Sequence, residues 1–205
     1  MKEIALYFAS SNEGKLVEVR TMLEAAALPI CVLSAKTAGG MPFVEENAPD
    51  YIGNARLKAR ALKASLGKDA WVLAEDSGLE VDALGGAPGI HTARYGSPDA
   101  SSLVKCAELL AEVDERSETN RKARFVCVMI LLTQDEEYIF RGECSGTLAR
   151  NMLGEQGFGY DPIFIPDGHN TTFAELGARV KNKISHRAQA LNALMGGLHS
   201  LTHLQ

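Results

Sequence analysis

The sequence predicts an α/β protein built around a mixed β-sheet. Short apolar runs alternate with segments in which apolar residues recur every three or four positions, as in strands that alternate with amphipathic helices. The longest apolar run, Arg124–Thr133, predicts a central strand, and the polar turn after it predicts an antiparallel hairpin with Tyr138–Cys144. Because this hairpin interrupts the alternation of strands and helices, the pattern differs from a regular Rossmann fold.

The other predicted elements follow the same two periodicities. Asp50 is a suitable N-cap for the helix that follows it. The expected strands are residues 4–9, 29–33, 71–74 and 163–165, and the expected helices are residues 14–27, 51–66, about 97–113 and a final helix entered by residues 181–187.

Length, charge and cysteine usage narrow the class of protein. A chain of 205 residues can form one large domain or two lobes around a sizeable core. The net charge of −5 provides no basic surface for nucleic acid or a membrane. No apolar run reaches the roughly 18 residues that a membrane span needs. The four cysteines are widely spaced, which favours reduced thiols over disulfides and predicts a cytoplasmic protein.

Two adjacent acids, Glu75 and Asp76, follow the apolar run Trp71–Ala74. Acids at the end of a core strand are held rigidly and can still face a cleft. They also repel each other, and a divalent cation relieves that repulsion. On this fragment alone, an ordinary strand that ends in a polar turn is an equally good interpretation.

A glycine-rich segment follows these acids and ends at Arg94. Its glycines allow the backbone to approach a ligand closely, and arginine suits carboxylate or phosphate groups. Loops of this kind are usually functional or mobile. An acidic pair, a glycine loop and an arginine in this order favour a binding site. The glycines are Gly78, Gly85, Gly86 and Gly89.

The turn Ser10–Lys15 joins a predicted strand to a predicted helix. The free N–H groups at a helix N-terminus and the helix dipole favour an anion, and Lys15 adds a positive charge. The turn is not a Walker A loop, because Leu16 follows the lysine. A simple N-cap by Ser11 or Asn12 is the alternative.

Three further groups of residues are candidates for ligand binding. Asn54 and Lys58 are four residues apart on one helix face and could reach a ligand together, although a solvated face is the alternative. Phe158 and Tyr160 are flanked by glycines that would let their rings lie against a flat ligand such as a base. Taken singly, both rings also fit a hydrophobic core. Three donors suited to carbonyl or phosphate oxygens follow later: Lys181, His186, which could also be a structural hydrogen bonder, and Arg187.

Several sequence blocks occur together in one order. They are Ser11-Asn12-x-x-Lys15, Glu46 ahead of Asn54-Ala55-x-x-Lys58-Ala59, AEDSGLEVDALGGAPG, Ala93-Arg94-Tyr95, GFGYDPIF and KNxxSHR. With these blocks the sequence closely resembles the XTP/dITP pyrophosphatases, also called the inosine triphosphate pyrophosphatase family, over about residues 4 to 195.

This resemblance implies a metal-dependent hydrolase that converts ITP, dITP and XTP to the monophosphate and pyrophosphate. It implies an elongated α/β structure, a single domain over residues 1–205 whose two lobes flank a central nucleotide cleft. It also implies a homodimer.

By motif position, the resemblance also implies the roles of individual residues. Asp76 would be the proton acceptor. Mg²⁺ would be bound by Glu46 and Asp76, with Glu75 as a third metal ligand nearby. The nucleotide would be bound by Ser10, Ser11, Asn12, Glu13, Gly14, Lys15, Lys58, Ser77, Phe158, Gly159, Tyr160, Asp161, Lys181, His186 and Arg187.

The sequence departs from the family pattern at a few positions. Gly53 stands where a glutamate is usual, and Glu75 replaces the more frequent aspartate, so the metal geometry near Glu75 is open. Two other functions stay possible: a pyrophosphatase for a pyrimidine or damaged nucleotide on the same scaffold, and a catalytically idle nucleotide-binding module. The intact acids argue against the idle module, because binding alone needs no group that activates water.

Overall fold

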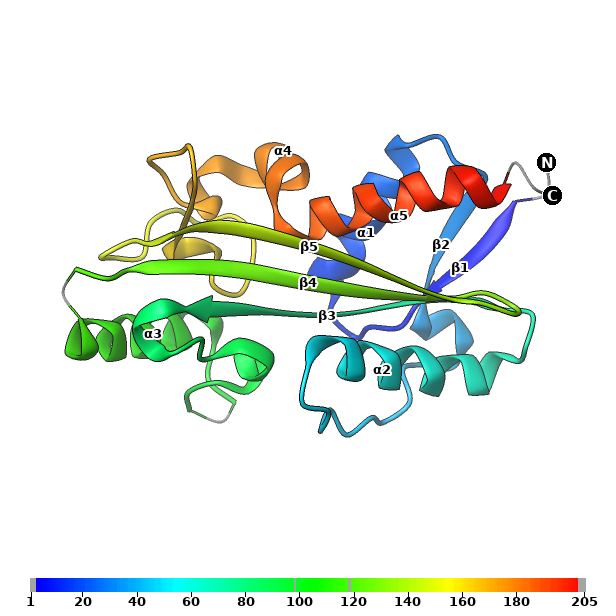
Figure 1. The fold of residues 1–205 in the computed structure, drawn as a ribbon, viewed down its shortest axis with the longest axis horizontal. Coiled ribbons are helices and arrows are strands. Elements are labelled where there is room, and N and C mark those ends of the chain that lie inside the picture. The colour runs from blue at the N-terminus through cyan, green and yellow to red at the C-terminus, as the bar shows by residue number, and fades with distance from the viewer. Residues whose placement is uncertain (1–2, 98, 118, 203–205) are drawn as a thin grey trace. The chain divides into compact units, whose positions relative to one another are not determined.

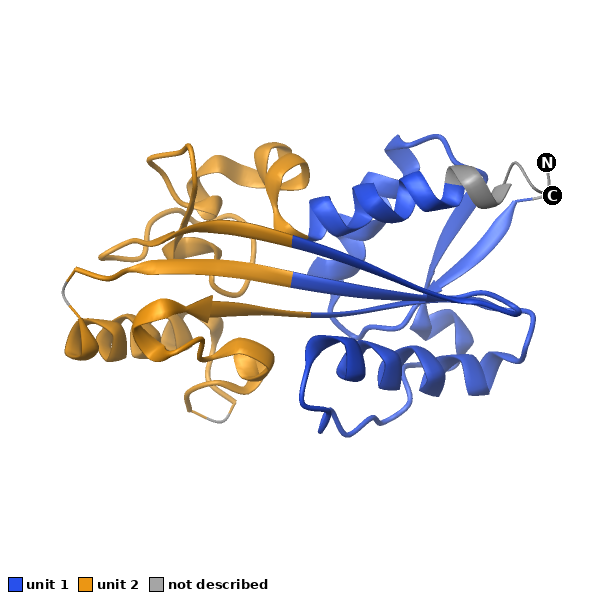
Figure 2. Cartoon of the chain, in the orientation of Figure 1, with its two compact units in different colours: residues 1–76, 127–142, 187–205 blue, residues 77–126, 143–186 orange. Residues whose placement is uncertain are grey.

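The computed structural model describes residues 3–97, 99–117 and 119–202. The chain divides into two compact units (Figure 2). Unit 1 comprises residues 1–76, 127–142 and 187–205, and unit 2 comprises residues 77–126 and 143–186.

Six strands form one sheet in the order β2-β1-β3-β4-β5-β6. Strands β1 to β5 are labelled in Figure 1. Strand β1 runs parallel to β2 and β3, whereas β5 and β6 are antiparallel, so the prediction of a mixed sheet is confirmed. The strands are β1 (Ile4–Phe8), β2 (Ile30–Ser34), β3 (Trp71–Val81), β4 (Lys122–Leu132), β5 (Glu137–Leu148) and β6 (Phe164–Pro166).

Five α-helices accompany the sheet in the described part of the chain. Ser101 caps α3 through its hydroxyl, so this helix begins later than the sequence predicts. Ser185 separates the last two helices, where a single final helix was expected. The helices are α1 (Glu13–Ala25), α2 (Tyr51–Leu66), α3 (Ser102–Arg116), α4 (Phe173–Ile184) and α5 (His186–Thr202). None of the described helices is long and apolar enough to cross a membrane.

The core of unit 1 has two layers, one on each face of the strands. On one face, residues of α1 and α5 pack against Leu6, Phe8 and Leu73. On the opposite face, residues of α2 pack against Val72 and Ala74. Successive residues of β3 therefore alternate between the α1 and α5 side and the α2 side, as the pleat of a strand requires.

Strand β3 is longer than the sequence predicts. The pattern Ser77-Gly78 suggested a turn after Ala74, yet the strand continues to Val81, and Leu79 and Val81 are fully buried. Glu75 and Asp76 therefore lie within the strand and not at its end. Because neighbouring side chains in a strand point to opposite faces, Glu75 and Asp76 face opposite sides of β3.

The core of unit 2 contains a group of aromatic rings among its aliphatic side chains. The ring of Phe125 lies 4.7 Å from that of Phe164, centroid to centroid, and the ring of Phe164 lies 5.4 Å from that of Phe173. His186 stacks on Phe125 with a centroid distance of 4.6 Å. All four cysteines of the chain are free thiols, as predicted, and Cys31 is the least buried of them.

Candidate active site

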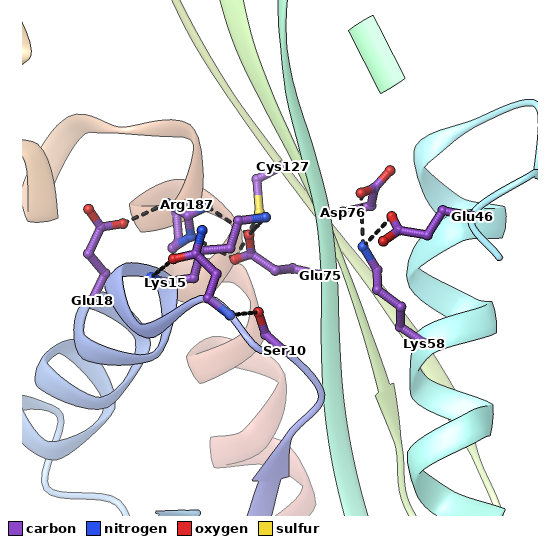
Figure 3. Close-up of polar contacts among 10 residues, drawn as sticks. Ser10, Lys15, Glu18, Glu46, Lys58, Glu75, Asp76, Cys127 and Arg187 are labelled. Carbon is purple, nitrogen blue, oxygen red and sulfur yellow. Dashed lines mark hydrogen bonds and ion pairs between the residues drawn. The ribbon is translucent and has the colours of Figure 1, made fainter. Parts of the chain in front are cut away.

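Glu75 and Asp76 point to opposite faces of β3 (Figure 3). Glu75 continues the series of Leu73 toward α1 and α5, and Asp76 continues the series of Val72 and Ala74 toward α2. Two adjacent acids thus take part in two separate polar clusters.

The first cluster surrounds Glu75, whose side chain is fully buried. Arg187 of α5 forms a bidentate ion pair with it, with Nε 2.6 Å from Oε2 and NH2 2.7 Å from Oε1. Lys15 of α1 places its Nζ 2.9 Å from Oε1. The guanidinium of Arg187 also donates from NH1 to Oε2 of Glu18, 2.6 Å away. We call these four side chains the Glu75 cluster; they carry two positive and two negative charges.

The charges of the Glu75 cluster stabilise one another. Burial alone would raise the pKa of Glu75, but the charges of Arg187 and Lys15 outweigh burial and hold that pKa well below its usual range. In the same way Glu75 keeps the pKa of the buried Arg187 well above its usual value. The cluster is therefore an ionised assembly on the α1 and α5 side of β3.

The second cluster surrounds Asp76. The Nζ of Lys58 lies 3.0 Å from Oδ1 of Asp76 and 2.8 Å from Oε2 of Glu46, so one ammonium bridges two carboxylates. Asn54, which is completely buried, donates from Nδ2 to Oδ2 of Asp76 over 3.3 Å. The other end of its amide accepts a hydrogen bond from the Ala48 N–H at 3.0 Å. We call Glu46, Asn54, Lys58 and Asp76 the Asp76 cluster.

The Asp76 cluster has an excess of negative charge. Its two carboxylates and single ammonium carry a net charge of −1. Burial raises the pKa of Asp76, and the attraction of Lys58 only partly offsets that effect. Asp76 is therefore a stronger base than an ordinary aspartate, as a proton acceptor needs to be.

The residues of the Asp76 cluster fit a Mg²⁺ ion. Mg²⁺ is usually held by one or two carboxylates, with water and substrate phosphates as its other ligands. Glu46 and Asp76 already converge on one cation, the ammonium of Lys58. Among the described residues there is no group of three or more His, Cys, Asp or Glu side chains that could hold a metal. Glu75 lies on the other face of β3, so the arrangement does not support its prediction as a third ligand.

The Ser10–Lys15 turn leads into α1. The side chain of Asn12 caps the helix by accepting from the Lys15 N–H at 3.1 Å, and the Asn12 N–H donates to Ser10 Oγ at 3.1 Å. The N-cap expected as the alternative interpretation is thus present. Ser11 and Glu13 are exposed, and Gly14 is half-buried beside them. The turn presents a helix N-terminus, a feature that suits an anion.

A separate group of predicted residues lies in unit 2. The Oδ2 of Asp161 accepts from the Phe158 N–H at 2.9 Å and from the Lys181 ammonium at 2.5 Å. This ammonium also lies 4.2 Å from the centroid of the Phe158 ring. The structure therefore brings Phe158, Asp161 and Lys181 together around the short glycine loop that contains Gly159.

Two other candidates, Tyr160 and His186, have structural partners. Tyr160 is buried, and its hydroxyl donates to the Thr92 carbonyl at 3.3 Å, which ties the glycine loop to the 3₁₀ segment Gly89–Arg94. His186 is buried against Phe125. Ser77, half-buried in β3, is the first residue of unit 2. The guanidinium of Arg187, which the sequence grouped with Lys181 and His186, belongs to the Glu75 cluster in unit 1.

Sequence reasoning missed the roles of Glu18 and Asn54. The sequence places Asn54 beside Lys58 on α2, but the link of Asn54 from Ala48 to Asp76 depends on the path of the loop before the helix. Glu18 lies three residues after Lys15 and so shares its side of α1, a signal that could have indicated a common partner.

The fold and the helix N-terminus beside the two clusters define a class of protein: an α/β protein whose site suits a phosphate-bearing ligand. The model of the Ham1 family matches residues 6–196, and the chain belongs to this family.

Similar proteins agree with this assignment over nearly the full chain. A dITP/XTP pyrophosphatase of Opitutus terrae is 45% identical over 190 residues, which cover 90% of this chain and 94% of that protein. A dITP/XTP pyrophosphatase of Bdellovibrio bacteriovorus is 41% identical over 198 residues, which cover 96% of this chain and 98% of that protein. A solved HAM1 protein from Coxiella burnetii superposes with a TM-score of 0.86 at 34% identity, covering 96% of this chain and 99% of that one.

Proposed function

We propose that the chain is a nucleoside-triphosphate pyrophosphohydrolase that removes non-standard purine nucleotides from the nucleotide pool. It converts dITP, ITP and XTP to the monophosphate and pyrophosphate. The observation that carries this proposal is the Asp76 cluster, a basic carboxylate beside a second carboxylate, in a chain that is 45% identical to a protein named dITP/XTP pyrophosphatase.

The proposed cofactor is Mg²⁺, held by Glu46 and Asp76. When bound, the ion would neutralise phosphate oxygens and lower the pKa of a bound water. The two carboxylates and their excess negative charge support this choice. Carboxylate and water oxygens are also the ligands that Mg²⁺ prefers.

The protein residues supply the proton transfer and the charge stabilisation. Asp76 accepts the proton of the attacking water, and its raised pKa suits it to that role. Asn54 holds the other oxygen of Asp76 and so fixes the orientation of the carboxylate. Lys15, Lys58 and the N-terminus of α1, with Ser10, Ser11, Asn12, Glu13 and Gly14, stabilise negative charge on the pyrophosphate that leaves.

We propose that base recognition belongs to residues of unit 2. The ring of Phe158 stacks on the base beside Gly159, and Asp161 and Tyr160 hold the loop in place. Ser77 contacts the substrate. Lys181 and His186 donate to the 6-carbonyl that hypoxanthine and xanthine carry. Adenine has a donor amine at that position, so two donors would face each other unpaired and the site rejects it. Arg187 belongs to the Glu75 cluster, where it binds Glu75, the residue that also pairs with Lys15.

A homodimer and a cytoplasmic location complete the proposal. The family resemblance supports the dimer, and the free cysteines are consistent with a reducing compartment. Light scattering coupled to size-exclusion chromatography gives the oligomeric state, and a mass of one chain would contradict the dimer.

The function is tested by incubating the purified protein with Mg²⁺ and each of dITP, XTP, dATP, dGTP and dUTP. Pyrophosphate release from dITP and XTP, with little from dATP, is the expected result. Preferred release from dUTP would favour the alternative of a pyrimidine pyrophosphatase. Nucleotide binding without any release would favour the idle binding module.

A further inference from the structure

The ammonium of Lys58 lies between the two carboxylates proposed to hold the metal. Its Nζ is 2.8 Å from Oε2 of Glu46 and 3.0 Å from Oδ1 of Asp76. The side chain is largely buried, at 12% exposure. A protein cation therefore sits on the oxygens that a divalent cation would need.

The carboxylates of the Asp76 cluster are held in place by more than Lys58. Asn54 binds Asp76 through Nδ2 and the loop of Glu46 through the Ala48 N–H. The two acids can therefore stay close together after the lysine leaves. Lysine is a mobile point charge on a four-carbon stem, unlike the planar guanidinium that locks both oxygens of Glu75.

We propose that Lys58 and the divalent cation compete for the same carboxylate oxygens. Without metal the ammonium neutralises part of the charge on Glu46 and Asp76. When the cation binds, Lys58 turns away from these oxygens and its charge becomes available to the phosphates of the nucleotide. The inference rests on the proposed function and deepens it, because it gives Lys58 one role before metal binding and another after it.

The competition makes an unusual prediction about metal affinity. Removing a residue from a metal site normally weakens binding or leaves it unchanged. Removing Lys58 removes a competing positive charge, so the cation should bind more tightly in the absence of nucleotide. The expected gain is about 10-fold, as for the loss of one unit charge a few ångströms from the ion in a partly screened site.

The test measures Mn²⁺ binding to the full chain by calorimetry without nucleotide, since carboxylate sites that take Mg²⁺ also take Mn²⁺. Lys58→Met should bind Mn²⁺ about 10-fold more tightly than the wild type. Arg60→Met, which removes the same charge from a more exposed position on α2, is the control and should change affinity less than about 2-fold. Equal or weaker binding by a folded Lys58→Met protein would overturn the proposal.

A second measurement uses the wild type and does not depend on the variant folding. Acetylation of individual lysines is followed by mass spectrometry with and without Mn²⁺. Labelling of Lys58 should increase with Mn²⁺, because the ammonium leaves its carboxylates. Labelling of Lys63, which donates to the Ala70 and Thr133 carbonyls, should not change. Unchanged labelling of Lys58 at saturating Mn²⁺ would contradict the competition.

Failure of this inference is distinct from failure of the proposed function. Hydrolysis of dITP by the wild type tests the function, whereas both experiments above are done without nucleotide. A protein that hydrolyses dITP but shows neither tighter Mn²⁺ binding in Lys58→Met nor a change in Lys58 labelling retains the function and loses the competition.

Discussion

The Glu75 cluster and the Asp76 cluster begin from adjacent residues of one strand and differ in charge and composition. Around Glu75 two cations meet two carboxylates, and the guanidinium of Arg187 binds both oxygens of the central acid. Around Asp76 the ammonium of Lys58 bridges two carboxylates, so the residues of this cluster carry a formal charge of −1. The alternation of β3 thus separates an acid with neutralising partners from an acid whose surroundings favour a further cation.

One strand thus contributes to stability through Glu75 and to the proposed chemistry through Asp76. A buried acid with matched positive partners is costly to disturb, because any change leaves a charge without compensation. A buried acid with too few positive partners has a raised pKa and is ready to take a proton or a metal. The comparison predicts that substitutions at Glu75 affect folding first and that substitutions at Asp76 affect catalysis first.

The largest effect is expected for Asp76→Asn. The amide keeps the size of the side chain but cannot accept the proton of the attacking water and is a poorer metal ligand, so kcat for dITP should fall about 10³-fold or more. Pyrophosphate release and thermal unfolding, measured on the same sample, check this. Glu45→Gln is the control, because Glu45 is exposed and should tolerate the change. Near-normal turnover of Asp76→Asn would remove the residue from its proposed role.

Glu75→Gln should lower the free energy of unfolding more than it lowers activity. It leaves the buried charge of Arg187 with one carboxylate fewer, and breaking a buried pair in this way costs about 3–5 kcal/mol of the free energy of unfolding. Urea unfolding measures the loss. The matched control is Glu13→Gln, which breaks the exposed pair with Lys36 and should cost less than about 1 kcal/mol. An equally small effect at Glu75 would contradict a stabilising role for its cluster.

Asn54→Ala should have an intermediate effect on both properties. It removes the amide that links the Ala48 N–H to Asp76, and an unsatisfied buried polar group costs about 1–3 kcal/mol. We expect kcat to fall as well, because the carboxylate of Asp76 loses a fixed partner. Unfolding and dITP hydrolysis measure the two effects. A loss of stability with unchanged kcat would show that Asn54 supports the fold alone.

The smallest effect concerns pH. The folded-state pKa of Glu75 lies well below the ordinary value of 4.5, so its ionised form stabilises the protein fully above that pH. The stabilisation is lost as pH falls below 4.5 toward the folded-state pKa. The difference in unfolding free energy between the wild type and Glu75→Gln should therefore be constant from about pH 5 to 7 and shrink at lower pH. A difference that grows on acidification would contradict this assignment.

Much of the fold was predictable from local patterns, but the length of β3 was not. Apolar runs and helical periodicity located the major helices and the strands of the sheet. The pair Ser77-Gly78 has the composition of a turn, whereas the strand continues because Leu79 and Val81 are buried in the core of unit 2. Burial of this kind depends on partners that are distant in sequence, so a local pattern does not reveal it.

The candidate site, too, was predictable only in part. The motifs indicated Glu46, Lys58 and Asp76 together, and the structure brings these three side chains into contact. The sequence does not indicate that Arg187 is the partner of Glu75, because Arg187 lies 112 residues further along the chain. Its motif predicts a role in binding the base instead. The predicted strand ends at Ala74, so the sequence also does not indicate that Glu75 and Asp76 alternate within β3 and belong to different clusters.

The most direct test of the division between the two clusters is Mn²⁺ binding to Glu75→Gln and Asp76→Asn, measured side by side with folded protein. Asp76→Asn should lose most of its affinity for Mn²⁺, whereas Glu75→Gln should stay within about 3-fold of the wild type, because its side chain lies on the other face of β3. Equal losses in the two variants would mean that both acids hold the metal and would contradict the division.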